Sequence, residues 1–154
     1  MNGWTDYEYD SDGIQTKSIW YNANGSARSI TEPNADKTGS KTTHYDDDGK
    51  INNIYEELDY GRRSKSTSYN PDGSLSGWSE NEHTGYTQTK SKYYDADGTL
   101  RSISENNANH TWSKDTYYNP DGSIQSISER KQENGKWKTT VYNADGSIAD
   151  QYEW

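Results

Sequence analysis

The chain has 154 residues, with 16 basic and 25 acidic side chains, a formal net charge of −9 and a mean hydropathy of −1.41. Only 27% of the residues are hydrophobic, which excludes a thick two-layer core, because ordering a residue costs about 1.5 kcal/mol against about 25 cal/mol per Å² of apolar burial. The acidic balance opposes nucleic acid and favours a basic partner surface, and the lack of cysteine excludes a disulfide framework and a thiolate zinc site.

The first twenty residues differ from the rest of the chain. The opening stretch MNGWTDYEYD is polar, so neither a signal peptide nor a membrane-inserting run is expected there. We therefore expect either a bacterial cytoplasmic protein or a module of a larger cell-surface protein. A turn sequence follows Tyr9, 12 residues before its next copy after Tyr21. Because 12 is half of the later spacing, residues 1–20 are predicted to form an atypical N-terminal cap.

From Tyr21 onward one turn sequence recurs: tyrosine, Asp or Asn, any residue, Asp or Asn, and glycine. Consecutive copies lie 24 or 25 residues apart, the length of one small supersecondary unit. The copies begin at Tyr21, Tyr45, Tyr69, Tyr94, Tyr118 and Tyr142. The pattern predicts that residues 1–154 form a single domain of β-hairpin repeats.

The turn residues predict a particular hairpin geometry. In the copy Asn70-Pro71-Asp72-Gly73, proline presets φ for a type I turn, Asn and Asp bond back to the backbone, and glycine takes the left-handed position of a G1 bulge. The tyrosine before each turn should then oppose the second residue after the glycine. The predicted pairs are Tyr21 with Ala27, Tyr45 with Ile51, Tyr69 with Leu75, Tyr94 with Leu100, Tyr118 with Ile124, and Tyr142 with Ile148.

Looser segments separate these turns, and they vary in length and sequence. They are PNADKTG (33–39), LDYGRR (58–63), NEHTG (81–85), NNANH (106–110) and KQENG (131–135). We expect the regular turns along one edge of a sheet and the variable loops along the other, where loops often carry specificity. No stretch of helical length has a 3.6-residue period. The expected fold is all-β, an antiparallel meander of about thirteen short strands.

The apolar residues indicate how this meander is layered. Ile124 and Ile127 are three positions apart, as are Leu100 and Ile103, so simple strand alternation places the members of each pair on opposite faces. Thin apolar stripes on both faces favour a single twisted or coiled sheet over a sandwich.

The sequences YYDADGTL (93–100) and ENGKWKTTVYNADGS (133–147) resemble the MORN-variant repeats of bacterial antitoxin-like proteins. Residues 9–148 are also similar to the YD repeats of the RHS family, although the arginine that often follows the YD glycine is absent and the second half-repeat lacks the regular glycine of MORN units. The resemblance implies an array of β-hairpins that binds or encloses a partner. It does not imply an enzyme.

Two motifs invite a chemical interpretation. GSLSG at 73–77 matches the nucleophile elbow, but this elbow needs a strand, a sharp turn and a helix, whereas here a hairpin glycine leads into a strand. The acidic turns resemble half of a calcium loop without its remaining ligands. We therefore expect no catalytic residue and no cofactor, with weak calcium binding at Asp46, Asp47 and Asp48 as an open alternative.

The remaining candidate binding residues are aromatic. Tyrosines and tryptophans among Asn, Gln, Ser and Thr suit a protein interface or a sugar ring, although the same rings could fill the thin core of a coiled sheet. The predicted binding surface consists of Trp78, Trp112, Trp137, Tyr69, Tyr118 and Tyr142. Three functions remain open: a protein-binding scaffold, such as an immunity-like or antitoxin-like inhibitor of a basic partner; a glycan-binding module; and a structural protein that self-associates through its edge strands.

Overall fold

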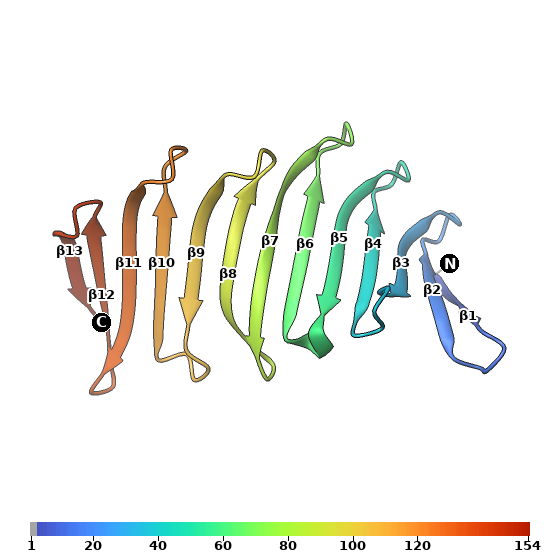
Figure 1. The fold of residues 1–154 in the computed structure, drawn as a ribbon, viewed down its shortest axis with the longest axis horizontal. Helices are drawn as coiled ribbons and strands as arrows, with labels where there is room; N and C mark the ends of the chain where they lie inside the picture. Colours follow the sequence, from blue (N-terminus) through green and yellow to red (C-terminus); the bar gives the residue numbers. More distant parts are fainter. Residues whose placement is uncertain (1–2) are drawn as a thin grey trace. The chain divides into compact units, whose positions relative to one another are not determined.

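The computed structural model describes residues 3–154 and contains thirteen strands and one short 3₁₀ segment. The strands lie in sequence order in one open antiparallel sheet (Figure 1). The predicted all-β meander is therefore confirmed. The elements are β1 (Trp4–Tyr9), β2 (Gln15–Tyr21), β3 (Ala27–Pro33), β4 (Ser40–Tyr45), β5 (Ile51–Leu58), η1 (Asp59–Gly61), β6 (Arg63–Tyr69), β7 (Leu75–Thr84), β8 (Thr87–Asp95), β9 (Leu100–Asn106), β10 (Trp112–Tyr118), β11 (Ile124–Glu133), β12 (Lys136–Asn143) and β13 (Ile148–Glu153).

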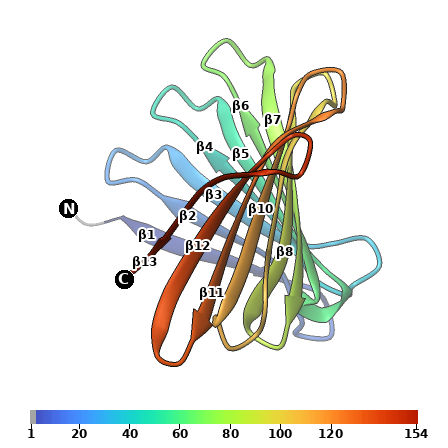
Figure 2. The same cartoon turned by 90° about the vertical axis from the view of Figure 1, so that its left-hand side faces the viewer.

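The chain divides into two compact units, Met1–Trp78 and Ser79–Trp154, and the division falls within β7. Met1 and Asn2, the first residues of the expected cap, lie outside the described residues. Within the first unit, each strand is rotated relative to the preceding one, as a twisted sheet requires (Figure 2).

All seven regular turns have the backbone hydrogen bonds of the predicted hairpin, a type I turn with a G1 bulge. In the turn after Tyr69, the N–H of Gly73 donates to the carbonyl of Asn70 at 2.8 Å, and the N–H of Asn70 donates to the carbonyl of Ser74 at 2.9 Å. Gly73 has a φ of +85°, the left-handed conformation that favours glycine. The equivalent pairs of bonds close the turns that begin at Asp10, Asn22, Asp46, Asp95, Asn119 and Asn143.

The predicted cross-strand register is also confirmed wherever the pairing is described. The pairs are Tyr21 with Ala27, Tyr45 with Ile51, Tyr94 with Leu100, Tyr118 with Ile124, and Tyr142 with Ile148. The pairing of Tyr69 with Leu75 stays a prediction. Next to each of these five tyrosines the register shifts by one residue, so a second irregularity accompanies each of these G1 turns.

This shift overturns the predicted orientation of the isoleucines. Tyr118 faces Ile124 and Thr116 faces Ile127. Because Thr116 and Tyr118 are two residues apart on one strand, both isoleucines lie on the same face. The same holds for Leu100 and Ile103, opposite Tyr94 and Lys92. The prediction from simple alternation was wrong because a bulge inserts one residue and restores the original face.

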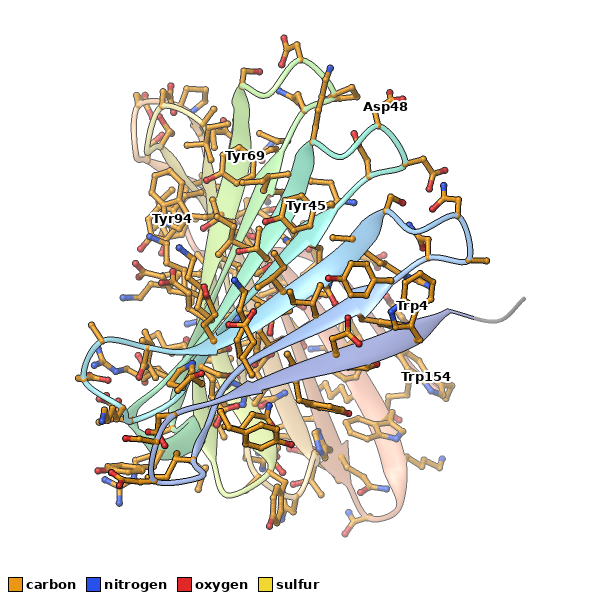
Figure 3. All side chains as sticks on the ribbon, turned by 90° about the vertical axis from the view of Figure 1, so that its right-hand side faces the viewer. Trp4, Tyr45, Asp48, Tyr69, Tyr94 and Trp154 are labelled. Atoms are coloured by element: carbon orange, nitrogen blue, oxygen red, sulfur yellow. The ribbon has the colours of Figure 1, made fainter. Side chains whose placement is uncertain are left out.

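Each unit therefore has two chemically different faces. We call the face that carries the turn tyrosines the tyrosine face: Tyr21, Tyr45 and Tyr69 in the first unit, and Tyr94, Tyr118 and Tyr142 in the second. Figure 3 shows Tyr45 and Tyr69 on the same side of the first unit. The opposite surface is the serine face, defined by Ser64, Ser66 and Ser68 in the first unit and by Ser91, Ser102 and Ser104 in the second.

No large hydrophobic side chain is buried within residues 3–154. The buried residues are small and polar: Ser29, Ser64, Ser91, Thr116, Thr139 and Thr140. All six lie within strands, where short side chains are covered by the longer side chains of the neighbouring strands. Stability then comes from the hydrogen-bonded ladder and from cross-strand pairs on both faces.

The connections alternate between the two ends of the strands, as expected for a meander. The loop after β3 is ordered by Asn34, whose Oδ1 accepts the N–H of Gly39 and whose Nδ2 donates to the carbonyl of Glu57 at 3.0 Å. The carbonyl of Thr38 accepts the N–H of Tyr60 at 2.7 Å, so this loop is joined to η1. The variable loops of the first unit therefore form a connected surface.

Candidate functional site

A groove on the tyrosine face of the first unit brings together two predicted binding residues, Tyr69 and Trp78. It has a volume of about 360 Å³ and lies over β4 to β7. Its lining consists of Lys41, Ile54, Glu56, Lys65, Thr67, Tyr69, Leu75 and Trp78. An apolar floor with charged and hydroxyl groups is typical of a site that holds a ligand in one orientation.

The charged residues of this groove lie opposite one another on neighbouring strands. Lys41 and Lys65 both lie opposite Glu56 on the neighbouring strands. The Nζ atom of Lys65 also lies 5.7 Å from the centroid of the Trp78 ring, within cation–π range. Trp78 is thus half-buried beside a cation, and its ring borders the groove.

In the second unit the predicted residues on the tyrosine face are Trp112, Tyr118 and Tyr142. Trp112 is half-buried, and its Nε1 donates to Oε1 of Glu129 at 2.7 Å. Tyr118 and Tyr142 both lie next to the strand that carries Ile127, and both are half-buried. Cross-strand packing therefore accounts for much of the surface of these rings.

Trp137 lies on the other surface, the serine face. The guanidinium of Arg130 lies 6.0 Å from the Trp137 ring and 5.3 Å from the Trp154 ring. Tyr152 stacks on Trp154 with ring centroids 5.5 Å apart. The predicted binding residues consequently do not form one continuous surface, because Trp137 is separated from Trp112, Tyr118 and Tyr142 by the thickness of the sheet.

Several more exposed aromatic residues were not predicted from the sequence. Trp20, Tyr93 and Tyr117 each precede a turn tyrosine, lie on the serine face and are 45%, 41% and 45% exposed. The guanidinium of Arg28 covers Trp20 at 4.5 Å. The position immediately before each repeat tyrosine was the available signal, because alternation places that residue on the opposite face.

A second missed feature is a row of alternating charges on the tyrosine face. Every repeat has a lysine four residues before its tyrosine and a glutamate eleven residues after it. We call this row the charge ladder. Its members are Glu8, Lys17, Glu32, Lys41, Glu56, Lys65, Glu80, Lys90, Glu105, Lys114, Glu129, Lys138 and Glu153, one on each strand from β1 to β13.

The register places most of these residues directly opposite one another. In the first unit Glu8 faces Lys17, and Lys41 lies between Glu32 and Glu56. Lys17 and Glu32 are 3.6 Å apart. In the second unit, Glu105 lies between Lys90, at 3.3 Å, and Lys114.

The ladder is interrupted at one described position. Between β11 and β12, Glu129 faces Thr140 and Lys138 faces Lys131. The Nζ atom of Lys131 forms an ion pair with Glu133 at 2.9 Å, and the carboxylate of Glu133 raises the pKa of Lys131. The like charges in this part of the sheet are therefore partly compensated.

The acidic turn after Tyr45 uses its first carboxylate internally. The Oδ1 atom of Asp46 accepts the N–H groups of Asp48 at 3.0 Å and Lys50 at 2.8 Å. Asp48 lies at the tip of the turn in Figure 3. No group of three or more His, Asp or Glu side chains among residues 3–154 is arranged to hold a metal ion. Weak calcium binding at Asp46, Asp47 and Asp48 stays a prediction.

The GSLSG stretch lies in a regular turn and the start of β7. The hydroxyl of Ser74 donates to the Oδ1 atom of Asp72 at 2.6 Å, and the N–H of Ser74 donates to the same oxygen at 2.9 Å. The serine therefore completes the turn in the same way as Ser123 and Ser147.

No protein-family model matches this chain, and no curated protein shows significant similarity to it. The resemblance to MORN-variant or YD repeats therefore stays a prediction. Within the described residues there is also no helix long and apolar enough to cross a membrane.

Proposed function

We propose that this chain is a non-enzymatic β-hairpin repeat module that binds a basic protein partner, in the manner of an immunity or antitoxin-like inhibitor. The observation that carries the proposal is the burial pattern: no large hydrophobic side chain within residues 3–154 is buried, and fifteen are exposed. Aromatic side chains are enriched as anchors in protein interfaces. The net charge of −9 favours a partner with a positive surface.

Selection from a display library of random peptides tests this function and requires no identified partner. Enriched peptides should contain lysine or arginine together with apolar residues, and their affinity should fall as salt rises, because exposed charge pairs are screened within about 10 Å at 0.1 M salt. A selection that yields no peptide with salt-dependent binding would contradict the proposal.

The groove beside Trp78 supports a second function, glycan binding. An aromatic ring bordered by Lys41, Glu56 and Thr67 offers a surface for a sugar ring together with hydrogen-bond partners for its hydroxyls. A neutral oligosaccharide that binds there should change tryptophan fluorescence with little dependence on salt. Trp78→Ala should abolish the change, whereas Trp20→Ala, on the serine face, should leave it intact.

Self-association is the third candidate function, and the charges of the outer strands argue against it. β1 carries Asp6 and Glu8, and β13 carries Asp150 and Glu153. Acidic side chains on edge strands are a common means of preventing edge-to-edge pairing. Analytical ultracentrifugation should therefore give one sedimentation coefficient over a wide concentration range at low salt.

A further inference from the structure

We propose that the outer edge of β1 binds an extended, lysine-bearing segment of a partner protein as an additional strand of the sheet. This inference rests on the proposed protein-binding function and assigns it a place and a partner chemistry. β1 stands at one end of the strand order, beside β2 (Figure 1), and no other strand of residues 3–154 pairs with it. All six of its residues are exposed.

The backbone of β1 has hydrogen-bonding groups directed at this edge. Asp10 bonds across the first hairpin, because its N–H donates to Ile14 and its carbonyl accepts from Gly13. In an antiparallel ladder alternate residues bond to the same neighbour. Glu8 therefore bonds toward β2, and the N–H and carbonyl groups of Tyr7 point outward, available to an added strand.

The charge ladder specifies which strand would fit. In the interior, Glu56 lies between Lys41 and Lys65, so a glutamate has a lysine on both sides. Glu8 faces Lys17 on its inner side alone. An added strand that places a lysine opposite Glu8 would continue the alternation, and opposite charges across neighbouring strands stabilise a sheet.

A second copy of this chain is a poor occupant. The ladder begins with Glu8 on β1 and ends with Glu153 on β13, so both outer strands contribute a glutamate to it. A pairing of these edges that continues the ladder places carboxylate against carboxylate, which is destabilising. A lysine-bearing strand is therefore a more favourable neighbour for β1 than a second copy of this chain.

The side chains of β1 supply apolar contacts on both faces of the sheet. Trp4, Tyr7 and Tyr9 are 44%, 54% and 58% exposed. Trp4 stacks on Tyr21 with ring centroids 5.0 Å apart, which holds its ring in place before a partner arrives. A pre-positioned aromatic ring loses little conformational entropy on binding.

The test uses two synthetic peptides, in which threonine alternates either with lysine or with glutamate, titrated into the ¹⁵N-labelled full chain at low salt. The lysine peptide should shift the amide signals of β1, with the largest changes at Thr5, Tyr7 and Tyr9. The glutamate peptide should produce no shift. Raising the salt concentration should weaken the binding of the lysine peptide.

Reversing the charges of β1 should weaken binding of the lysine peptide and create binding of the glutamate peptide. The double variant Asp6→Lys, Glu8→Lys should bind the lysine peptide about ten-fold more weakly and should now bind the glutamate peptide. The matched control Asp47→Lys, Asp48→Lys changes the net charge equally at exposed turn positions. It should alter the affinity for the lysine peptide by no more than about two-fold.

A proline variant separates strand addition from general electrostatic attraction. Tyr7→Pro removes an outward N–H from an edge strand, a position where proline is tolerated, and it should abolish peptide binding. Tyr7→Thr removes the ring but keeps the N–H, so it should retain most of the affinity. Dispersed amide spectra confirm that both variants remain folded.

Three results would overturn the inference. If the lysine peptide shifts amides away from β1, a basic partner binds elsewhere, so this inference fails and the proposed function stands. If Tyr7→Pro binds as well as Tyr7→Thr, no strand is added. If the lysine peptide and the display selection both give no binding, the proposed function fails as well.

Discussion

In the turns after Tyr69, Tyr118 and Tyr142, one aspartate oxygen near the tip binds the serine that follows the glycine. The Oδ1 atom of Asp72 accepts both the hydroxyl and the N–H of Ser74, and these two bonds hold the pKa of Asp72 below its ordinary value of 3.8. Asp121 and Asp145 do the same with Ser123 and Ser147. In the first repeat, Asn24 makes the same two contacts with Ser26 and carries no charge.

These turns should make the fold sensitive to acid. A carboxyl group whose pKa is lower in the folded state contributes stability above its unfolded pKa, and that stability is lost as the pH falls through the folded pKa. The melting temperature should therefore decline below pH 3.8. The triple variant Asp72→Asn, Asp121→Asn, Asp145→Asn should show a smaller decline, measured by circular dichroism from pH 7 to about pH 2.

The loop after β3 contains a glycine required by close packing. A Cβ atom added at Gly39 would lie 2.0 Å from the carbonyl oxygen of Glu57, which belongs to the backbone and cannot rotate away. Gly39→Ala should destabilise the chain by about 2 kcal/mol or more, as measured by urea unfolding. Lys37→Gly in the same loop should be neutral or stabilising, since Lys37 has a φ of +57°. Equal effects of the two changes would contradict this explanation.

At the scale of the strand, the charge ladder favours pairing between a strand that contributes a lysine and a strand that contributes a glutamate. A lysine strand is flanked by glutamate strands wherever the register is described, apart from the interruption between β11 and β12. Shifting a strand by one residue would move its lysine to the opposite face, where Ser and Thr predominate. The ladder therefore supports the register that the turns establish.

Reversing one charge within the ladder should cost more than reversing a charge beside it. Lys114→Glu would place a third carboxylate between Glu105 and Glu129, whereas Lys92→Glu changes a residue that faces Ile103. The first variant should be less stable than the second by about 1 kcal/mol at low salt. Urea unfolding at low salt and at about 1 M salt checks this, since screening should remove most of the difference.

At the scale of the whole molecule, the sheet is stabilised without a hydrophobic interior. Its central positions hold small hydroxyl side chains, and its rings and aliphatic groups are half-buried or exposed on the two faces. Nearly all backbone pairing is between strands that follow one another in the chain. Such local pairing needs little loop closure, so it compensates for a low content of apolar residues.

This architecture should have a small heat capacity of unfolding. Exposure of apolar surface raises the heat capacity and exposure of polar surface lowers it, and ordinary globular proteins average about 12 to 15 cal/mol/K per residue. The value for this chain should fall below that range. Differential scanning calorimetry at several pH values measures it, and a value within the range would indicate more apolar burial than the described residues contain.

Much of the fold could be predicted because its repeats encode local geometry. Turn residues such as Asn70-Pro71-Asp72-Gly73 determine a hairpin by their own backbone preferences, and the hairpin then determines the partner of each tyrosine. The candidate site was harder to predict. Trp78 and Tyr69 were identified and lie in one groove, but Trp20 and the charge ladder were missed, although aligning the repeats by their tyrosines would have revealed both.

The sequence by itself determined the number of strands, the turn type and the order of pairing, because each depends on residues close together in the chain. The tertiary structure alone decided which residues share a face. Ile124 and Ile127, three residues apart, lie on the same face because a bulge next to Tyr118 shifts the alternation by one residue. A bulge arises from pairing with a neighbouring strand, so no rule based on spacing within one strand could have predicted its effect.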